Sequence, residues 1–216
     1  MSEENNETEV KFHIQHIRAV KERLQTLGAL LIHPRTLELN LRFDTPGGDL
    51  IREGRVLRLR QDDAIRLTYK DGSRIKDGAL SRREIEFSVS DLDSAQQFIE
   101  ALGYEMVFIY EKYRTTYSMP VKGREVAMDL QRRETHIMLD ELPYGNFVEI
   151  EGELDELKPL AQKLLLDWDT AIPASYHTLF ERVSRSKNLT FRDLRFEKFK
   201  GIEIGSDDLG VHPADM

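Results

Sequence analysis

The sequence predicts an α+β protein that is dominated by antiparallel sheet. Two observations carry this prediction: many short segments alternate apolar and polar residues, and three others repeat apolar residues at helical spacing. A third observation concerns charge, because the polar positions of the alternating segments are nearly all carboxylate, Arg or Lys. With 216 residues, the chain can build one ample core and at most two small domains.

Three helices are expected, over residues 16–30, 92–102 and 154–166. In each, apolar residues recur three or four positions apart, as on the buried stripe of a surface helix. Gly28 and Gly103 supply the left-handed residue with which many helices end. These spacings place one apolar face of each helix against the sheet.

The strands are expected where the period changes to two. The alternating segments are VLRLRQ, IRLTYK, REIEFSV, EKYRTTYSM, REVAMDL, THIMLD and NFVEIEG. Turn residues separate most of them, at 45–48, Asp71-Gly72, Lys122-Gly123 and 143–145. Strands joined by short turns pair antiparallel.

A weak internal repeat links strands to helices. The pairs are Glu7 with Glu9, Glu84 with Glu86, and Glu149 with Glu151, and each pair precedes one of the three expected helices. Within a strand, the two glutamates of a pair point to the same face. The repeat therefore predicts three strands that carry acidic side chains on equivalent faces.

The charged strand faces allow two arrangements. A flat sheet could turn its charged face to water, which is the usual reading of any single strand. Like charges directly opposite one another repel, so several such strands in a row favour a sheet that closes around a charged lumen. Patterning alone leaves both open.

A charged lumen of this composition would suit a metal–polyphosphate substrate. Paired carboxylates are hard oxygen ligands for Mg²⁺ or Mn²⁺. The cations expected on the same faces can grip several phosphate groups; they are Arg58, Arg60, Lys70, Lys112 and Arg114. The Gly-x-x-x-x-Gly-Lys-Ser/Thr sequence of a P-loop is absent.

Composition excludes several other classes. The net charge of −8 argues against a nucleic-acid partner, and the absence of cysteine excludes thiol chemistry and zinc–thiolate sites. The start of the chain, MSEENNE, is unlike a signal peptide, and no apolar run is long enough to span a membrane. We therefore expect a cytoplasmic protein, a monomer or a homodimer.

Several segments together resemble the CYTH superfamily, the triphosphate tunnel metalloenzymes, which include class IV adenylate cyclases, thiamine triphosphatases and inorganic triphosphatases. ETEVK resembles the family's Glu-x-Glu-x-Lys signature, and LRFDTPGGDL resembles its Tyr-Phe-Asp-Thr-Pro segment, with Arg42 in place of the tyrosine. VLRLR, RLTYK, REIEF, EKYR, IMLDELPYGNFVEIEG and SYHTLF follow in the family's order. The resemblance implies a closed, eight-stranded antiparallel β tunnel with a charged lumen and helices packed outside.

The resemblance also implies roles for single residues. Glu7, Glu9, Glu149 and Glu151 would bind the divalent metal, and Lys11, Arg58, Arg60, Lys70 and Arg114, with Lys112 a weaker candidate, would hold the triphosphate. Catalysis would rest on Glu9, Glu151 and Asp140. Glu84 and Glu86 would be structural partners of the arginines, and Ser175-Tyr176 matches a pair at the start of the last core helix.

The remaining expectations concern boundaries and function. We expect a tunnel domain over residues 5–184 and a C-terminal extension over 185–216, partly packed and loose at its end. Arg82-Arg83 is expected in solvent, His136 is the one histidine with a possible site role, and Asp129 is left outside the site.

Hydrolysis of tripolyphosphate, ATP or thiamine triphosphate is the first functional reading, since no residue plainly reads adenine. A class IV adenylate cyclase and a non-catalytic polyphosphate-binding module are the alternatives.

Overall fold

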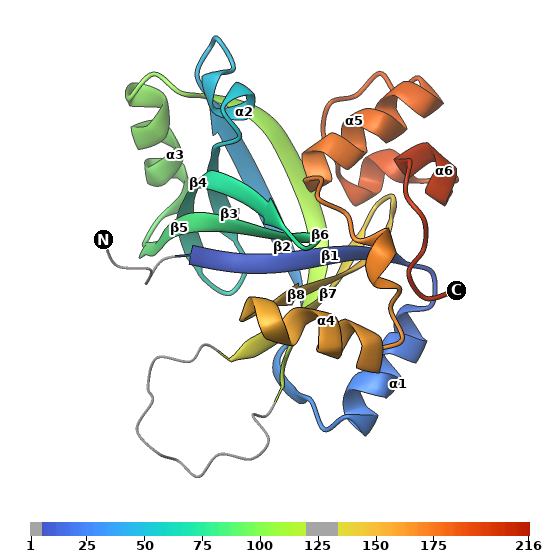
Figure 1. Ribbon diagram of the computed structural model, residues 1–216. Coiled ribbons are helices and arrows are strands. Elements are labelled where there is room, and N and C mark those ends of the chain that lie inside the picture. The colour runs from blue at the N-terminus through green and yellow to red at the C-terminus, as the bar shows by residue number, and fades with distance from the viewer. Residues whose placement is uncertain (1–5, 120–133) are drawn as a thin grey trace, which may run out of the picture.

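Eight β-strands close into an antiparallel barrel in the computed structural model, which describes residues 6–119 and 134–216 (Figure 1). Around the barrel the strand order is β1-β5-β4-β3-β2-β6-β7-β8, and β8 pairs with β1. The strands are β1 (Asn6–Ile14), β2 (Leu30–Asp44), β3 (Val56–Gln61), β4 (Ile65–Lys76), β5 (Ala79–Val89), β6 (Glu105–Met119), β7 (Thr135–Leu142) and β8 (Gly145–Glu151). The predicted closed tunnel is confirmed.

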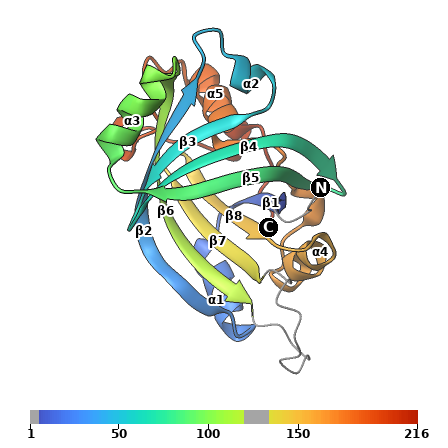
Figure 2. The same ribbon diagram turned by 90° about the vertical axis from the view of Figure 1, so that its left-hand side faces the viewer.

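The three predicted helices are present and lie outside the barrel (Figures 1 and 2). They are α1 (Ile17–Thr26), α3 (Leu92–Ala101) and α4 (Leu154–Lys163), each shorter at its ends than the apolar spacing suggested. They follow β1, β5 and β8, the three strands with a Glu-x-Glu pair. The remaining helical segments are α2 (Asp49–Arg52), η2 (Trp168–Thr170), α5 (Tyr176–Lys187), η3 (Phe196–Phe199) and α6 (Ser206–Leu209).

The strands alternate because one face packs on helices and the other lines the lumen. On β1 and β8 the outward residues Phe12 and Ile150 are fully buried in a cluster with Leu24 of α1 and Leu157 of α4. A second cluster joins β2 and β3 to Ile99 of α3. Outward apolar contact therefore holds the inward charged faces in a ring.

The predicted turn at Asp71-Gly72 is wrong. β4 continues to Lys76, and the pairing with β5 shifts register between Asp71 and Arg74. Gly72 has φ 65, a left-handed conformation that suits the extra residue of a β-bulge. The chain reverses at Asp77 and Gly78 instead, where φ is 51 and 86.

Other expectations fall on residues 120–133. The expected strand REVAMDL, the turn at Lys122-Gly123 and the side chain of Asp129 lie outside the described residues. Within the described ranges, no helix is long and apolar enough to cross a membrane.

The C-terminal extension packs against one end of the barrel. Leu194 and Phe199 are buried in a cluster with Phe180 and Val183 of α5, which runs through the predicted boundary at residue 184. The final stretch is not loose, in contrast to the expectation. The Ala214 N–H donates to the carbonyl of His13 at 2.8 Å, and the Asp215 carboxylate accepts from two backbone N–H groups that lead into α1.

Asp215 should therefore contribute to stability. Its two oxygens lie 2.9 Å from the Gln15 nitrogen and 2.7 Å from the His16 nitrogen. Asp215→Ala leaves both donors without this acceptor, and we expect the free energy of unfolding in urea to fall by about 1–2 kcal/mol. The matched control, Asp63→Ala at an exposed turn, should change it by less than about 0.5 kcal/mol. Equal stability of the two variants would show that the terminus is not anchored through Asp215.

Candidate functional site

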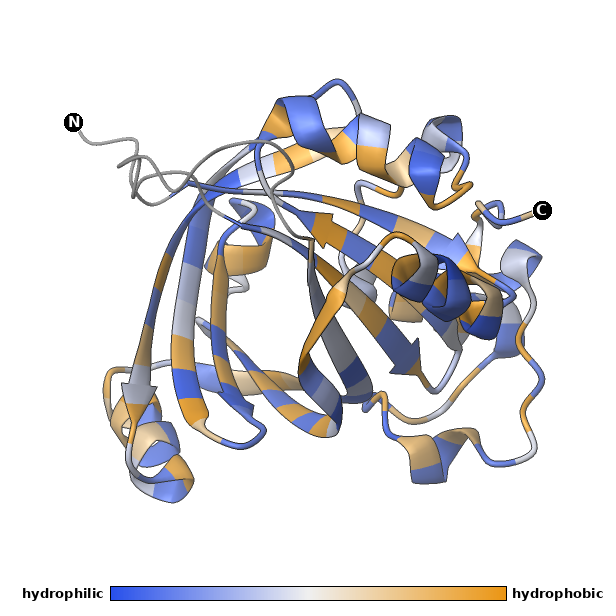
Figure 3. Ribbon diagram, turned by 90° about the horizontal axis from the view of Figure 1, so that it is seen from below, coloured by the Kyte–Doolittle hydropathy of each residue, from blue (hydrophilic) through white to orange (hydrophobic). Residues whose placement is uncertain are grey.

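The lumen is a cavity of about 1000 Å³ lined by residues from all eight strands of the barrel. Figure 3 looks along the ring of strands and shows hydrophilic and hydrophobic residues alternating along them. Ten of the eleven predicted site residues line this cavity: Glu7, Glu9, Lys11, Arg58, Arg60, Lys70, Lys112, Arg114, Glu149 and Glu151. The eleventh, Asp140, is fully buried and does not line the cavity.

The acidic wall arises where β1 meets β8. Their register places Glu9 opposite Glu151 and Lys11 opposite Glu149. Because side chains two apart share a face, Glu7 lies beside Glu9 on the same inner surface. The closure of the barrel thus brings the first and third Glu-x-Glu pairs together.

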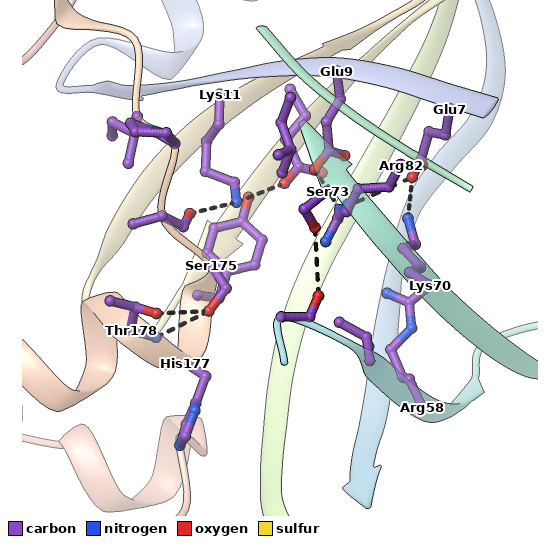
Figure 4. A pocket seen from close by; sticks show the side chains of 18 of the residues that line it. Glu7, Glu9, Lys11, Arg58, Lys70, Ser73, Arg82, Ser175, His177 and Thr178 are labelled. Carbon is purple, nitrogen blue, oxygen red and sulfur yellow. Dashed lines mark hydrogen bonds and ion pairs between the residues drawn. The ribbon is translucent and has the colours of Figure 1, made fainter. Parts of the chain in front are cut away.

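Three carboxylates of this wall hold basic partners from other strands. Glu7 contacts the Lys70 ammonium, and the Arg82 guanidinium donates to Glu9 at 2.7 Å (Figure 4). The Lys11 ammonium lies 3.2 Å from Glu149, which also accepts from Arg114. Each of these three carboxylates is at most 9% exposed, so its charge is neutralised within the protein.

Glu151 differs from the other three. No cation among the described residues lies within 4.0 Å of its carboxylate. Burial raises its pKa to about 7, and the negative charge of Glu7 adds to this effect. A cation placed between Glu151 and its acidic neighbours would remove this repulsion.

Asp140 organises the basic side of the tunnel. It is fully buried and accepts hydrogen bonds from Nε and Nη2 of Arg114, at 2.7 and 2.6 Å, and from the Lys112 ammonium at 2.9 Å. The Tyr176 hydroxyl donates to it at 2.8 Å. Through these contacts Asp140 holds the Arg114 guanidinium and the Lys112 ammonium in fixed positions.

Glu38 on β2 is an acidic residue that sequence reasoning missed. It lies 3.4 Å from Lys112 and 3.8 Å from Arg60. Burial alone would raise the pKa of Glu38, but the charges of Lys112, Arg114 and Arg60 lower it to about 2. The alternation in LELNLR puts it on the same face as Asn40 and Arg42, which is the signal that could have found it.

The expectation that Arg82 lies in solvent is wrong. Its side chain is 13% exposed and lines the cavity, whereas the neighbouring Arg83 is 55% exposed and pairs with Asp71 outside. The turn lies earlier, at Gly78, so Arg82 already belongs to β5. Period-two alternation with Glu84 and Glu86, which also line the cavity, would have placed it inward. Glu86 pairs with Arg60 at 3.4 Å, as the expected partner of an arginine should.

Among the histidines, His177 rather than His136 reaches the cavity. His136 is 35% exposed in its side chain and lies 3.7 Å from Glu134. His177 is the second residue of α5 and lines the cavity. Its ring packs on that of Phe108, with the two ring centroids 4.4 Å apart. Its side chain reaches the cavity from α5, next to Ser175 and Thr178 (Figure 4).

A family model described as the CYTH domain matches residues 5–169, most of the chain. This chain belongs to the CYTH domain family. The closed barrel and its inward acidic and basic faces are therefore those of a CYTH tunnel.

Known proteins agree with this assignment. A putative adenylate cyclase of Methanocaldococcus jannaschii is 26% identical over 179 residues, covering 79% of this chain and 95% of the relative. The X-ray structure of a putative adenylate cyclase from Vibrio parahaemolyticus superposes with a TM-score of 0.68 at 22% identity, over 82% of this chain and 98% of that one. A Hippeastrum protein described as a putative adenylyl cyclase with a dominant triphosphatase activity gives 0.57 at 20% identity, over 85% and 97%. At these identities the solved structures establish the shared fold.

The carboxylates of this CYTH tunnel fit a divalent cation in chemistry, although no ready-made cluster of three metal-ligating side chains occurs among residues 6–119 and 134–216. The reason is that the carboxylates are held in ion pairs with basic side chains. The pairs are Glu7 with Lys70, Glu9 with Arg82, and Glu149 with Lys11. A substrate that draws these cations away would release oxygen ligands beside Glu151. The acidic wall therefore suits a metal that binds together with an anionic substrate.

The pKa of Glu151 has a consequence for stability. Its folded-state pKa of about 7 exceeds its ordinary value of 4.5, so the folded state binds this proton more tightly than the unfolded state. The stability that this provides is fully present below pH 4.5 and is lost as pH rises through 7. In EDTA, Glu151→Gln should be more stable than the wild type at pH 8, by on the order of 2 kcal/mol, and the difference should vanish at about pH 4, below the ordinary pKa of 4.5. Urea unfolding at both pH values measures this. The exposed control Glu203→Gln should show no such trend, and a pH-independent effect of Glu151→Gln would contradict the raised pKa.

Proposed function

We propose that this protein is a divalent-metal-dependent enzyme that cleaves a phosphoanhydride bond of a triphosphate inside the tunnel. The observation that carries the proposal is a single cavity in which an acidic wall, with Glu151 unpaired among the described residues, faces a set of converging cations. A triphosphate satisfies the cations, and a divalent metal satisfies the carboxylates. The CYTH relatives named as adenylate cyclases or as having triphosphatase activity support this substrate class.

The basic side chains would bind and orient the phosphates. Lys11, Arg58, Arg60, Lys70 and Arg114 reach the lumen from β1, β3, β4 and β6, so they surround a linear anion. Lys112 is held behind them by Asp140 and Glu38. Fixed cations of this kind stabilise the charge that develops on phosphate oxygens during cleavage without reorganising.

Glu7, Glu9, Glu149 and Glu151 would hold Mg²⁺ or Mn²⁺, both of which take oxygen ligands and phosphates together. When bound, such a metal neutralises phosphate charge and lowers the pKa of a bound water. Glu151, on the same wall, would accept a hydrogen bond from the attacking water and orient it. Asp140 keeps Arg114 and Lys112 in place for the phosphates.

The cyclase alternative uses the same grip on the triphosphate but a different nucleophile, the ribose hydroxyl, with pyrophosphate as the leaving group. The name of the Methanocaldococcus relative favours it. A non-catalytic module that binds polyphosphate is the second alternative, but its affinity for a polyanion would gain from losing carboxylates, and the acidic wall here is complete.

One experiment separates the three. The protein is incubated with Mg²⁺ or Mn²⁺ and tripolyphosphate, ATP or thiamine triphosphate, and the products are resolved as phosphate, pyrophosphate or cyclic AMP. We expect metal-dependent release of phosphate from the wild type and a loss of at least about 100-fold in kcat for Glu9→Gln. Glu203→Gln, on the surface, should keep full activity. Unchanged phosphate release by Glu9→Gln would remove the metal assignment, and no turnover of any substrate would leave the binding module.

Arg58→Ala should chiefly weaken substrate binding. Arg58 lies 3.8 Å from Glu86 and 3.4 Å from the Thr68 hydroxyl, two long contacts that a phosphate can replace, and its buried Nε has no hydrogen-bond partner. Loss of a charge-assisted hydrogen bond of about 1.5–3 kcal/mol predicts a rise in KM of about tenfold or more. Steady-state kinetics with the best substrate of the panel measures it, with Arg83→Ala as the surface control. A fall in kcat at constant KM would instead show that Arg58 contacts the phosphate only in the transition state.

A further inference from the structure

Arg42 lines the tunnel, but the proposed function assigns it no role. It projects from β2 into the cavity, directly opposite Arg58 on β3. In the described part of the chain, no carboxylate oxygen lies within 4.0 Å of its guanidinium, and its buried Nε atom has no hydrogen-bond partner. An unpaired charge in such a place is costly unless something else neutralises it.

The other strand cations that line the cavity differ from Arg42 in their distance to a carboxylate. Each has a carboxylate within 4.0 Å, a set that comprises Lys11, Arg58, Arg60, Lys70, Arg82, Lys112 and Arg114. Burial lowers the pKa of Arg42, and the charges of Arg58 and Arg82 lower it further, although Tyr110 acts the other way. Arg42 therefore stands in a positive corner of the lumen and lacks the acidic partner that its neighbours have.

This corner lies toward the mouth of the tunnel. The cavity's lining includes the α2–β3 segment and α5 residues such as His177 and Arg182, whereas Asp62 and Arg66, beside the β3–β4 turn, do not line it. His177 packs on Phe108, which is the cross-strand neighbour of Arg42 on β6. An anion bound by Arg42 would thus lie level with Arg58, at one end of a substrate whose other phosphates reach Arg60.

The cavity is also larger than a triphosphate chain requires. Its volume of about 1000 Å³ lies at the upper end of small-molecule sites. Part of the rim is apolar, at Ile51, Ile75 and Leu80, and could lie against an organic group. Such a group would occupy the space but would leave the Arg42 charge unpaired.

We propose that Arg42, together with Arg58, forms a subsite for a fourth phosphate at the outer end of the tunnel. The inference rests on the proposed triphosphate site and extends it: the protein binds a chain of four phosphates more tightly than a chain of three. The fourth phosphate belongs either to an inorganic polyphosphate or to a nucleoside tetraphosphate.

Paired ligands test the subsite directly. Binding of tripolyphosphate and tetrapolyphosphate, and of ATP and adenosine 5′-tetraphosphate, is measured by calorimetry in EDTA for the wild type and Arg42→Gln. For at least one pair, the fourth phosphate should tighten wild-type binding by about tenfold or more, the effect of one charge-assisted contact. Arg42→Gln should lose most of this gain while binding the three-phosphate member nearly as well as the wild type. The pair that shows the gain identifies the source of the fourth phosphate.

Two further variants keep the test decisive. Arg42→Lys, which retains the charge, should recover part of the gain, and Arg83→Gln on the outer surface should keep all of it. Without ligand, Arg42→Gln should melt no lower than the wild type, because it removes an unpaired charge. The proposal is overturned if the wild type shows no gain in either pair, if Arg42→Gln keeps the gain, or if it weakens three- and four-phosphate ligands equally. Because binding is read without metal, an absence of turnover would refute the proposed function and leave this result standing.

Discussion

The pairing of β8 with β1 is the contact on which the rest of this tunnel depends. Without it the sheet would have two free edges, and the glutamates near the two ends of the domain would lie far apart. With it, Glu9 faces Glu151 and Lys11 faces Glu149 across adjacent strands. The energy that holds this contact comes from outside the lumen, where Phe12 and Ile150 pack against α1 and α4. Apolar burial outside thus supports charge concentration inside.

Charge in the lumen is largely balanced by ion pairs between strands. Such pairs are a poor source of net stability, because desolvation offsets their attraction. They do keep each side chain in a defined place, so that both anion-binding and cation-binding groups are held ready in the lumen. Under the proposed function, a substrate anion and a metal cation would exchange with them, since each would take over partners that the other releases. The exceptions are the carboxylate of Glu151 and the guanidinium of Arg42, which lack an oppositely charged partner among the described residues, and they mark where the balance requires a ligand.

Much of the site could be predicted, and the misses have physical reasons. Ten predicted residues line one cavity because period-two alternation fixes which face a side chain takes. Arg82 was misplaced because Ser81 and Gly78 indicate a turn close to it, whereas β5 already begins at Ala79. Gly72 likewise signals a turn, but the long-range pairing of β4 with β5 absorbs it as a bulge. Asp140 shares the inward face but is covered by the groups it binds, a fact of packing that alternation does not contain.

The sequence by itself determined the α+β class, the three helices, the charged strand faces and the resemblance to CYTH proteins, because these depend on local periodicity and motif order. Only the tertiary structure decided which charges meet. Partners such as Lys70 with Glu7 and Arg82 with Glu9 are more than 60 residues apart, and strand register selects them. The docked C-terminus, held by Asp215, and the unpaired state of Arg42 likewise follow from contacts between distant segments, which no local pattern specifies.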